Sequence, residues 1–97
     1  MEVRFRGRAL QRRYERSAEA ARAWGPEVGR RYVERVRILI GTERVADLYT
    51  FRALDLHPLT GERAGLHALR LTGQVRLVIR VDDERTVTVW EVVDYHG

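Results

Sequence analysis

The sequence predicts one small α+β domain in which a pair of helices covers one side of a mainly antiparallel sheet. Apolar residues recur at helical spacing in the first half of the chain, and short aliphatic runs separated by turn residues fill the second half. With 97 residues, of which 44% are hydrophobic, the chain can bury one core and has no room for a second. Residues 1–97 are therefore expected to form a single domain.

The first elements are a short strand and a helix. Val3 and Phe5 alternate with charged residues, which is the period of a strand. Over residues 9–24 the period changes to that of an amphipathic helix. The apolar residues that define its face are Leu10, Tyr14, Ala18, Ala21 and Trp24.

A second helix is predicted from Pro26 to Gly41. Gly25 ends the first helix, and proline is favoured in the first turn of the next one. Because the joint is short, we expect the two helices to pack as an antiparallel pair. Thr42 is placed to cap a further helical turn.

The second half is expected to form the sheet. Residues 66–72, 75–81 and 86–93 are rich in aliphatic and β-branched side chains. The turns between these runs are short, so consecutive runs must be antiparallel neighbours. Residues 51–56 are a candidate further strand, which gives three to four antiparallel strands after the helices.

Alternation in the middle run predicts two different faces of this sheet. The side expected to lie against the helices consists of Val75, Leu77, Ile79 and Val81. The other side carries Arg76 and Arg80 and is predicted to be open and basic. These two arginines are candidate phosphate contacts, although a solvated strand face would show the same pattern.

The charge of the chain favours an anionic partner. The formal net charge is +4, and all 18 residues in the Lys+Arg count are arginines. Such a chain attracts nucleic acid or an acidic protein. An arginine-biased genome would produce the same composition, so charge alone does not decide between these explanations.

Several kinds of chemistry and location are not expected. The chain has no cysteine, which excludes disulfides, thiolate catalysis and cysteine-ligated zinc. The acidic residues 82–84 are interpreted as a solvated turn, so neither a metal ion nor a cofactor is expected. The first residues lack the apolar segment of a signal peptide, and no apolar run has the length of a membrane span. We therefore expect a cytoplasmic protein with no membrane partner.

Two stretches carry side chains suited to acid–base chemistry. His57 precedes a glycine-punctuated basic loop, and Asp94, Tyr95 and His96 follow the final apolar run. Imidazole exchanges a proton near neutral pH, and arginine binds phosphate well. Together these groups suggest a protein that handles, and can cut, a phosphodiester.

The same stretches carry a resemblance to a known family. Residues 56–66, LHPLTGERAGL, resemble the H-P-L-K-G-(D/E)-R-x-G segment of HigB-type toxins, in the RelE/ParE superfamily of bacterial toxin–antitoxin systems. Residues 93–96, VDYH, resemble the family's (E/V)-D-Y-H ending, and residues 75–78 lie where the family has its arginine-bearing strand. Residues 25–28 are similar to a branch labelled killer-suppression protein. The resemblance covers essentially the whole chain, and its specific motifs lie in the second half.

This resemblance implies a RelE-like fold and a toxin that enters the ribosomal A site and cleaves messenger RNA. A cognate, HigA-like antitoxin would keep it silent. On the matching positions, His57, Asp94, Tyr95 and His96 would be the catalytic group, and Arg76 a phosphate contact. Cleavage would need no metal: one group would activate the 2′-hydroxyl and another would protonate the leaving 5′-oxygen. Asp94 would orient an imidazole or act as the base.

The chain departs from the family at two positions. Thr60 stands where many relatives have lysine, and we expect Arg63 to supply part of that charge. His67 stands where relatives often have an aromatic ring, and it is interpreted as a packing or surface residue.

Three other functions are compatible with the sequence. The chain could be a ParE-like toxin that inhibits gyrase by contact, although such relatives lack the histidine and tyrosine cluster. It could be a module that binds RNA or ribosomes without cutting, which would need Arg76 and Arg80 but not His57. It could also be a decayed toxin that has lost the group replaced by Thr60.

Overall fold

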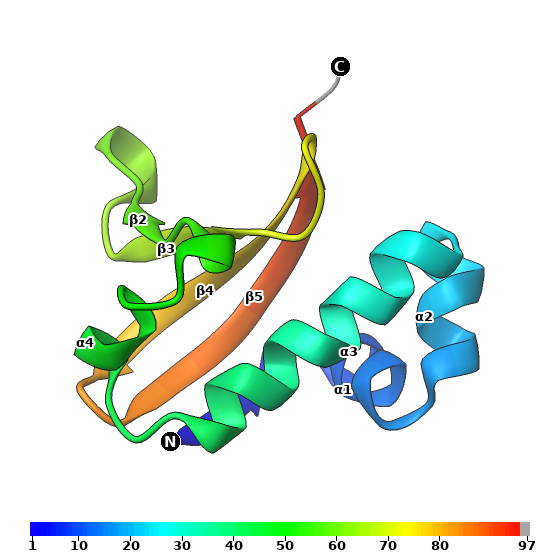
Figure 1. Ribbon diagram of the computed structural model, residues 1–97, viewed down its shortest axis with the longest axis horizontal. Coiled ribbons are helices and arrows are strands. Elements are labelled where there is room, and N and C mark those ends of the chain that lie inside the picture. Colours follow the sequence, from blue (N-terminus) through cyan, green and yellow to red (C-terminus); the bar gives the residue numbers. More distant parts are fainter. Residues whose placement is uncertain (96–97) are drawn as a thin grey trace.

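The computed structural model, which describes residues 1–95, contains a five-stranded sheet with the three longest helices stacked on one face (Figure 1). In chain order the elements are β1 (Glu2–Phe5), α1 (Arg8–Glu15), α2 (Ser17–Trp24), α3 (Pro26–Gly41), α4 (Val45–Leu48), the 3₁₀ turn η1 (Arg52–Leu54), β2 (His57–Pro58), the 3₁₀ turn η2 (Gly61–Arg63), β3 (Leu66–Arg70), β4 (Val75–Asp83) and β5 (Thr86–Asp94). The α+β class and the predicted order of strand, helices and sheet are confirmed.

The strands are arranged in the order β1-β5-β4-β3-β2. The pairs β3·β4 and β4·β5 are antiparallel, as predicted, and β2 is antiparallel to β3. β1 lies parallel to β5, with Glu2 opposite Thr86 and Phe5 opposite Val89. Parallel neighbours need a long crossover, and here it comprises every element between the two strands. β5 is thus an inner strand, and β1 forms one edge of the sheet.

The first predicted helix is in fact two helices. Arg16 has extended backbone angles, φ −128° and ψ 99°, and separates α1 from α2. The break rotates the apolar stripe: Ala20 is fully buried, whereas Ala18, which a single helix would place on the apolar face, is exposed. α1 can therefore pack against β1, where the rings of Phe5 and Tyr14 stack, while α2 packs on α3.

α2 and α3 lie side by side as a helical hairpin joined at Gly25 (Figure 1). Gly25 has a φ of 88°, a conformation that favours glycine. The two backbones touch at Gly29, where an added Cβ atom would lie 2.7 Å from the backbone nitrogen of Ala21. None of the helices within residues 1–95 combines the length and apolar character needed to cross a membrane.

The core lies between the helices and one face of the sheet. Leu77 and Ile79 of β4 are fully buried there, as predicted, together with Val87 and Val89 of β5. Val78 is also fully buried, although the alternation placed it on the open side. It lies in the middle of that side, flanked by neighbouring strands. The open side therefore has a buried, apolar centre at Val78, and its basic residues lie around that centre.

The strand predicted at residues 51–56 is wrong. Residues Arg52–Leu54 form η1, and β2 begins only at His57. Leu54 and Leu56 are buried in the core, which explains the strand-like apolar content of this segment. Between them Asp55 adopts left-handed backbone angles, with a φ of 47°, and turns the chain into β2.

Candidate functional site

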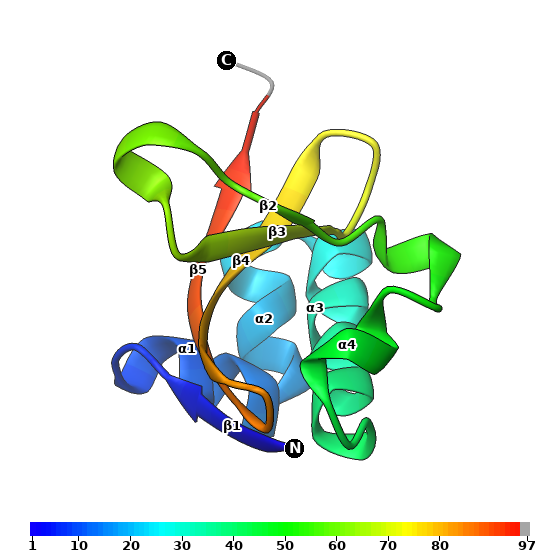
Figure 2. The ribbon, with the colours of Figure 1, turned by 90° about the vertical axis from the view of Figure 1, so that its left-hand side faces the viewer.

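The sheet face that points away from the helices carries most of the predicted site residues. We call it the open face; in Figure 2 it is turned toward the viewer, with α2 and α3 behind the strands. By strand register its charged members are His57 on β2, Arg70 on β3, Arg76 and Arg80 on β4, Glu91 on β5, and Glu2 and Arg4 on β1.

His57 is exposed on this face and its ring is held by the backbone. The Nδ1 atom lies 2.9 Å from the carbonyl oxygen of Asp55. A carbonyl only accepts hydrogen bonds, so Nδ1 carries the proton, and Nε2 of the neutral ring is left as an acceptor. The carboxylate of Asp55 in turn pairs with Arg70 at 3.3 Å. The contribution of Asp55 was not predicted, because it acts through its backbone oxygen.

His67 is half-buried on β3, opposite Pro58 of β2. Burial lowers the pKa of His67, and the charge of nearby His57 lowers it further. Its Nδ1 atom is buried and has no hydrogen-bond partner within residues 1–95. His67 is therefore a neutral neighbour of His57 at physiological pH, consistent with a packing role.

Arg76 lies at the end of β4 near the β3–β4 turn. Its side chain is half-buried, and Nη1 donates to the carbonyl oxygens of Thr72 at 2.6 Å and Val75 at 3.3 Å. Tyr95 reaches the same turn, since its backbone nitrogen donates to the carbonyl oxygen of Gln74 at 3.1 Å. The Tyr95 side chain is exposed. The structure thus brings Arg76 and Tyr95 to one end of the open face.

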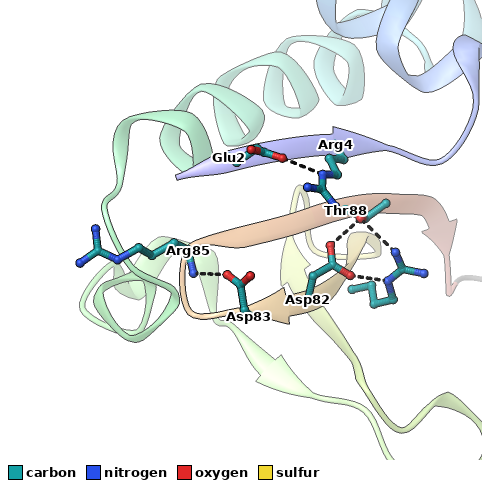
Figure 3. A network of polar contacts seen from close by, with 7 residues as sticks. Glu2, Arg4, Asp82, Asp83, Arg85 and Thr88 are labelled. Carbon is teal, nitrogen blue, oxygen red and sulfur yellow. Dashed lines mark hydrogen bonds and ion pairs between the residues drawn. The ribbon is translucent and has the colours of Figure 1, made fainter.

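Arg80 lies further along β4, toward the β4–β5 turn. Its Nε donates to Asp82 at 2.6 Å, and Asp82 also accepts a 2.7 Å hydrogen bond from Thr88 (Figure 3). Burial alone would raise the pKa of Asp82, but the bonds from Thr88 and Arg80, with the charges of Arg80 and Arg4, outweigh it and hold the pKa below its usual value. The acidic turn is therefore more than a solvated turn.

Asp83 and Glu84 belong to the same acidic turn as Asp82. Within the described part of the chain, no three His, Cys, Asp or Glu side chains converge as metal ligands. Asp83 instead accepts a hydrogen bond from the backbone nitrogen of Arg85 and so stabilises the turn (Figure 3).

A bulge in β5 adds two side chains that were not predicted as site residues. Val78 pairs with Glu91 and Ile79 with Val89, so Trp90 is the extra residue. Glu91 pairs with Arg6 at 3.7 Å and with Arg63 at 3.5 Å. The only signal in the sequence is the loss of alternation at Trp90 and Glu91.

Two arginines lie close to the ring of Trp90: Arg6, which directly follows β1, and Arg80 of β4. The guanidinium carbon of Arg6 is 4.2 Å from the centre of the ring, and that of Arg80 is 5.1 Å away. Arg6 also donates from Nε to the carbonyl oxygen of Trp90 at 3.0 Å. Trp24, by contrast, packs on Tyr32 in the helical layer.

Asp94 is not on the open face. It pairs with Val75 and lines a groove of about 310 Å³ together with Trp24, Val28 and Val92, on the side of the sheet that faces the helices. His96 lies outside the described residues. The open face therefore gathers His57, Arg63, Arg76, Arg80 and, at its end, Tyr95.

No family model matches the chain, and no curated protein sequence matches it either. Solved structures do match its fold. YafQ from E. coli strain BL21(DE3) has a TM-score of 0.67 at 12% identity, covering 96% of this chain and 91% of that one. A YoeB/ParE toxin from Agrobacterium tumefaciens has a TM-score of 0.59 at 19% identity, covering 99% and 100%. A mutant of YafQ from E. coli has a TM-score of 0.63 at 14% identity, with 96% and 91% covered. The chain has the RelE-like toxin fold that was predicted.

Proposed function

We propose that this chain is the toxin of a toxin–antitoxin pair and that it cuts messenger RNA in the ribosomal A site. One observation carries the proposal: His57 is held on an arginine-rich sheet face with Nε2 directed to no partner within residues 1–95. The fold shared with a YoeB/ParE toxin and the HigB-like motifs support the same function.

The reaction is an attack by the 2′-hydroxyl on the adjacent phosphorus. Nε2 of His57 takes the hydroxyl proton, the 2′-oxygen bonds to phosphorus, and the bond to the 5′-oxygen breaks. An acid returns a proton to that oxygen, which leaves a 2′,3′-cyclic phosphate and a 5′-hydroxyl. Each positioned acid or base contributes about 10²–10⁴-fold. No metal takes part.

The remaining groups have roles that follow from their chemistry and, for the described residues, from their places on the sheet. Arg76, Arg63 and Arg80 neutralise the charge that develops on the phosphate oxygens. His96 is the proposed acid, and Tyr95 stacks on a base or donates a hydrogen bond. Asp94 lies on the other face, so its proposed role is that of a positioning residue that orients an imidazole.

The proposed partners are a HigA-like antitoxin and the ribosome. A basic open face attracts an acidic segment, and electrostatic steering makes such capture fast. Because the catalytic groups are few, the ribosome is expected to supply much of the substrate positioning. The site of action is then the cytoplasm, where translation takes place.

The test is to map new 5′ ends on a translated reporter message after brief induction. Wild type should produce ends inside the coding region, and these should disappear when initiation is blocked. His57→Gln and His96→Gln should each reduce cleavage about 10²–10⁴-fold. His67→Gln, which alters a neighbouring imidazole with no proposed proton transfer, should retain cleavage.

Other outcomes identify the alternatives. Growth arrest with an intact message would refute the nuclease proposal and favour contact inhibition of gyrase, as in a ParE-like toxin. An intact message without arrest would indicate a decayed toxin. Ribosome binding that survives His57→Gln, without any cleavage by wild type, would indicate a module that binds and does not cut.

A further inference from the structure

Glu91 is a carboxylate held between two arginines that come from distant segments. Arg6 follows β1 and Arg63 belongs to η2, and both guanidinium groups reach Glu91 on the bulge of β5. All three side chains are accessible: Arg6 is 49% exposed, Arg63 38% and Glu91 35%. Solvent, and therefore a ligand, can reach the point where they meet.

The bonds at Glu91 are looser than other ion pairs on the same face. The N–O distances are 3.7 Å to Arg6 and 3.5 Å to Arg63, whereas Arg80 meets Asp82 at 2.6 Å. Tight charge-assisted bonds are about 2.7–2.9 Å long, and exposed pairs contribute little to stability. Displacing Glu91 would therefore cost the protein little.

The neighbouring indole favours a nucleic acid over an acidic protein as the ligand. Trp90 is half-buried beside this ion pair, with Arg6 and Arg80 close to its ring. Proteins that hold single-stranded RNA combine cations for the phosphates with aromatic or guanidinium planes for the bases. An acidic peptide would use the arginines and would have no need of the indole.

We infer that Arg6, Arg63 and Trp90 form a binding site for the backbone of single-stranded RNA, and that Glu91 occupies the phosphate position until RNA displaces it. Glu91 gives each arginine a single oxygen, at 3.5 and 3.7 Å, whereas a phosphate that is free to approach can offer two oxygens to one arginine fork. The inference rests on the proposed function only in taking RNA as the ligand. It extends the proposed RNA contact across the open face, from His57 to the β1 edge of the sheet.

The experiment measures the affinity of a labelled RNA oligonucleotide in which every ribose is 2′-O-methylated. Such RNA cannot be cut by 2′-hydroxyl attack, so binding is measured apart from cleavage and without ribosomes. Glu91→Gln should bind roughly three- to tenfold more tightly than wild type, because two arginines are released. The matched control is Glu62→Gln, which removes the same charge from an exposed residue of η2 and should change affinity less than twofold.

A double variant that lacks both arginines separates displacement of Glu91 from the general effect of removing a negative charge. In Arg6→Gln/Arg63→Gln, RNA affinity should fall relative to a control that replaces the exposed Arg8 and Arg12 of α1. Adding Glu91→Gln to that background should restore nothing, since no paired arginine is left to release. A gain that persists there would overturn the displacement mechanism. Trp90→Phe should weaken RNA binding, and thermal melting checks that each variant is folded.

The remaining outcomes are also decisive. Failure of wild type and Glu91→Gln to bind RNA at low salt would overturn the inference, as would equal gains for Glu91→Gln and Glu62→Gln. The inference would also be overturned if polyglutamate bound more tightly than RNA and Trp90→Phe left both affinities unchanged. The site would then be assigned to an acidic protein. If RNA binds in the expected pattern but no message is cut in cells, the proposed nuclease function fails while this site stands.

Discussion

Asp82 shows how single side chains order the open face. It joins β4 to β5 by accepting hydrogen bonds from Arg80 and from Thr88, which is itself buried. The two donors bond different oxygens, Arg80 to Oδ1 and Thr88 to Oδ2. Asparagine would keep one acceptor, put an amide donor in place of the other oxygen and remove the charge. The same carboxylate also keeps Arg80 beside the ring of Trp90.

We expect Asp82→Asn to lower the free energy of unfolding by about 1–2 kcal/mol at pH 7. The folded pKa of Asp82 is lowered, so its stabilisation is present above the unfolded value of about 3.9 and is lost as the pH falls through the folded value. The difference between wild type and variant should therefore shrink below about pH 4. Urea unfolding at several pH values measures this, with the exposed Asp47→Asn as control. A pH-independent difference would contradict the charged role.

Tyr32 performs a similar function inside the helical layer. Its ring is fully buried in α3, and its hydroxyl donates to the carbonyl oxygen of Leu10 in α1 at 2.6 Å. Burial raises the pKa of Tyr32, so the hydroxyl keeps its proton. Tyr32→Phe should cost about 0.5–1.5 kcal/mol of unfolding free energy. The control is Tyr14→Phe, because the Tyr14 ring is half-buried and its hydroxyl has no hydrogen bond within residues 1–95. It should lower the unfolding free energy less than Tyr32→Phe does. Equal losses would contradict a stabilising hydrogen bond from Tyr32 to Leu10.

Among the elements, the hairpin of α2 and α3 depends on one close backbone contact. An added Cβ at Gly29 would lie 2.7 Å from Ala21 and 2.8 Å from Ala20, in both cases against backbone atoms that cannot move alone. We expect Gly29→Ala to destabilise the protein by about 1–3 kcal/mol, despite the better helix propensity of alanine. In contrast, a Cβ at Gly41 meets nothing within 4 Å, so Gly41→Ala should be neutral or stabilising. Denaturant titration of both variants tests the pair.

The positions of the elements could largely be predicted from the sequence, but their breaks could not. The spacing of apolar residues, together with the turn residues, locates α3 and strands β3 to β5. Each of these elements buries one continuous row of apolar side chains, so its spacing is visible in the sequence. The break at Arg16 has no such signal, since arginine suits a helix and only the packing of α1 on β1 favours extended angles there. The bulge at Trp90 leaves only a weak signal, the loss of alternation at Trp90 and Glu91. Because Val92 and Val93 are both apolar, the sequence does not show which of them faces the core.

The candidate site divides in the same way. His57, Arg63, Arg76 and Arg80 could be found from residue type and spacing, since their side chains carry the chemistry. Asp55 could not, because it fixes the imidazole of His57 through a carbonyl oxygen that every residue possesses. The side of the sheet on which Asp94 lies depends on the bulge and was also beyond prediction.

For the whole molecule, the two layers are expected to unfold together. Trp24 reports on the helices and Trp90 on the sheet, and the core residues that join the layers form one cluster. Trp24→Phe leaves Trp90 as the fluorescent reporter, and Trp90→Phe leaves Trp24. Within each variant, the fluorescence midpoint in urea should coincide with the midpoint from circular dichroism. Different midpoints would show that the sheet and the helices unfold separately.

The parallel pairing of β1 with β5 has a consequence for how the chain is made. β1 leaves the ribosome early, yet its neighbour in the sheet, residues 86–89, is synthesised after all the elements between them. At about 5–20 residues per second, the nascent chain spends roughly 4–17 s without β5, the strand that lies between β1 and β4. During that time Arg6, Trp90 and Glu91 lie on segments that have not met, and the open face is incomplete. The topology therefore delays completion of the open face until synthesis reaches β5.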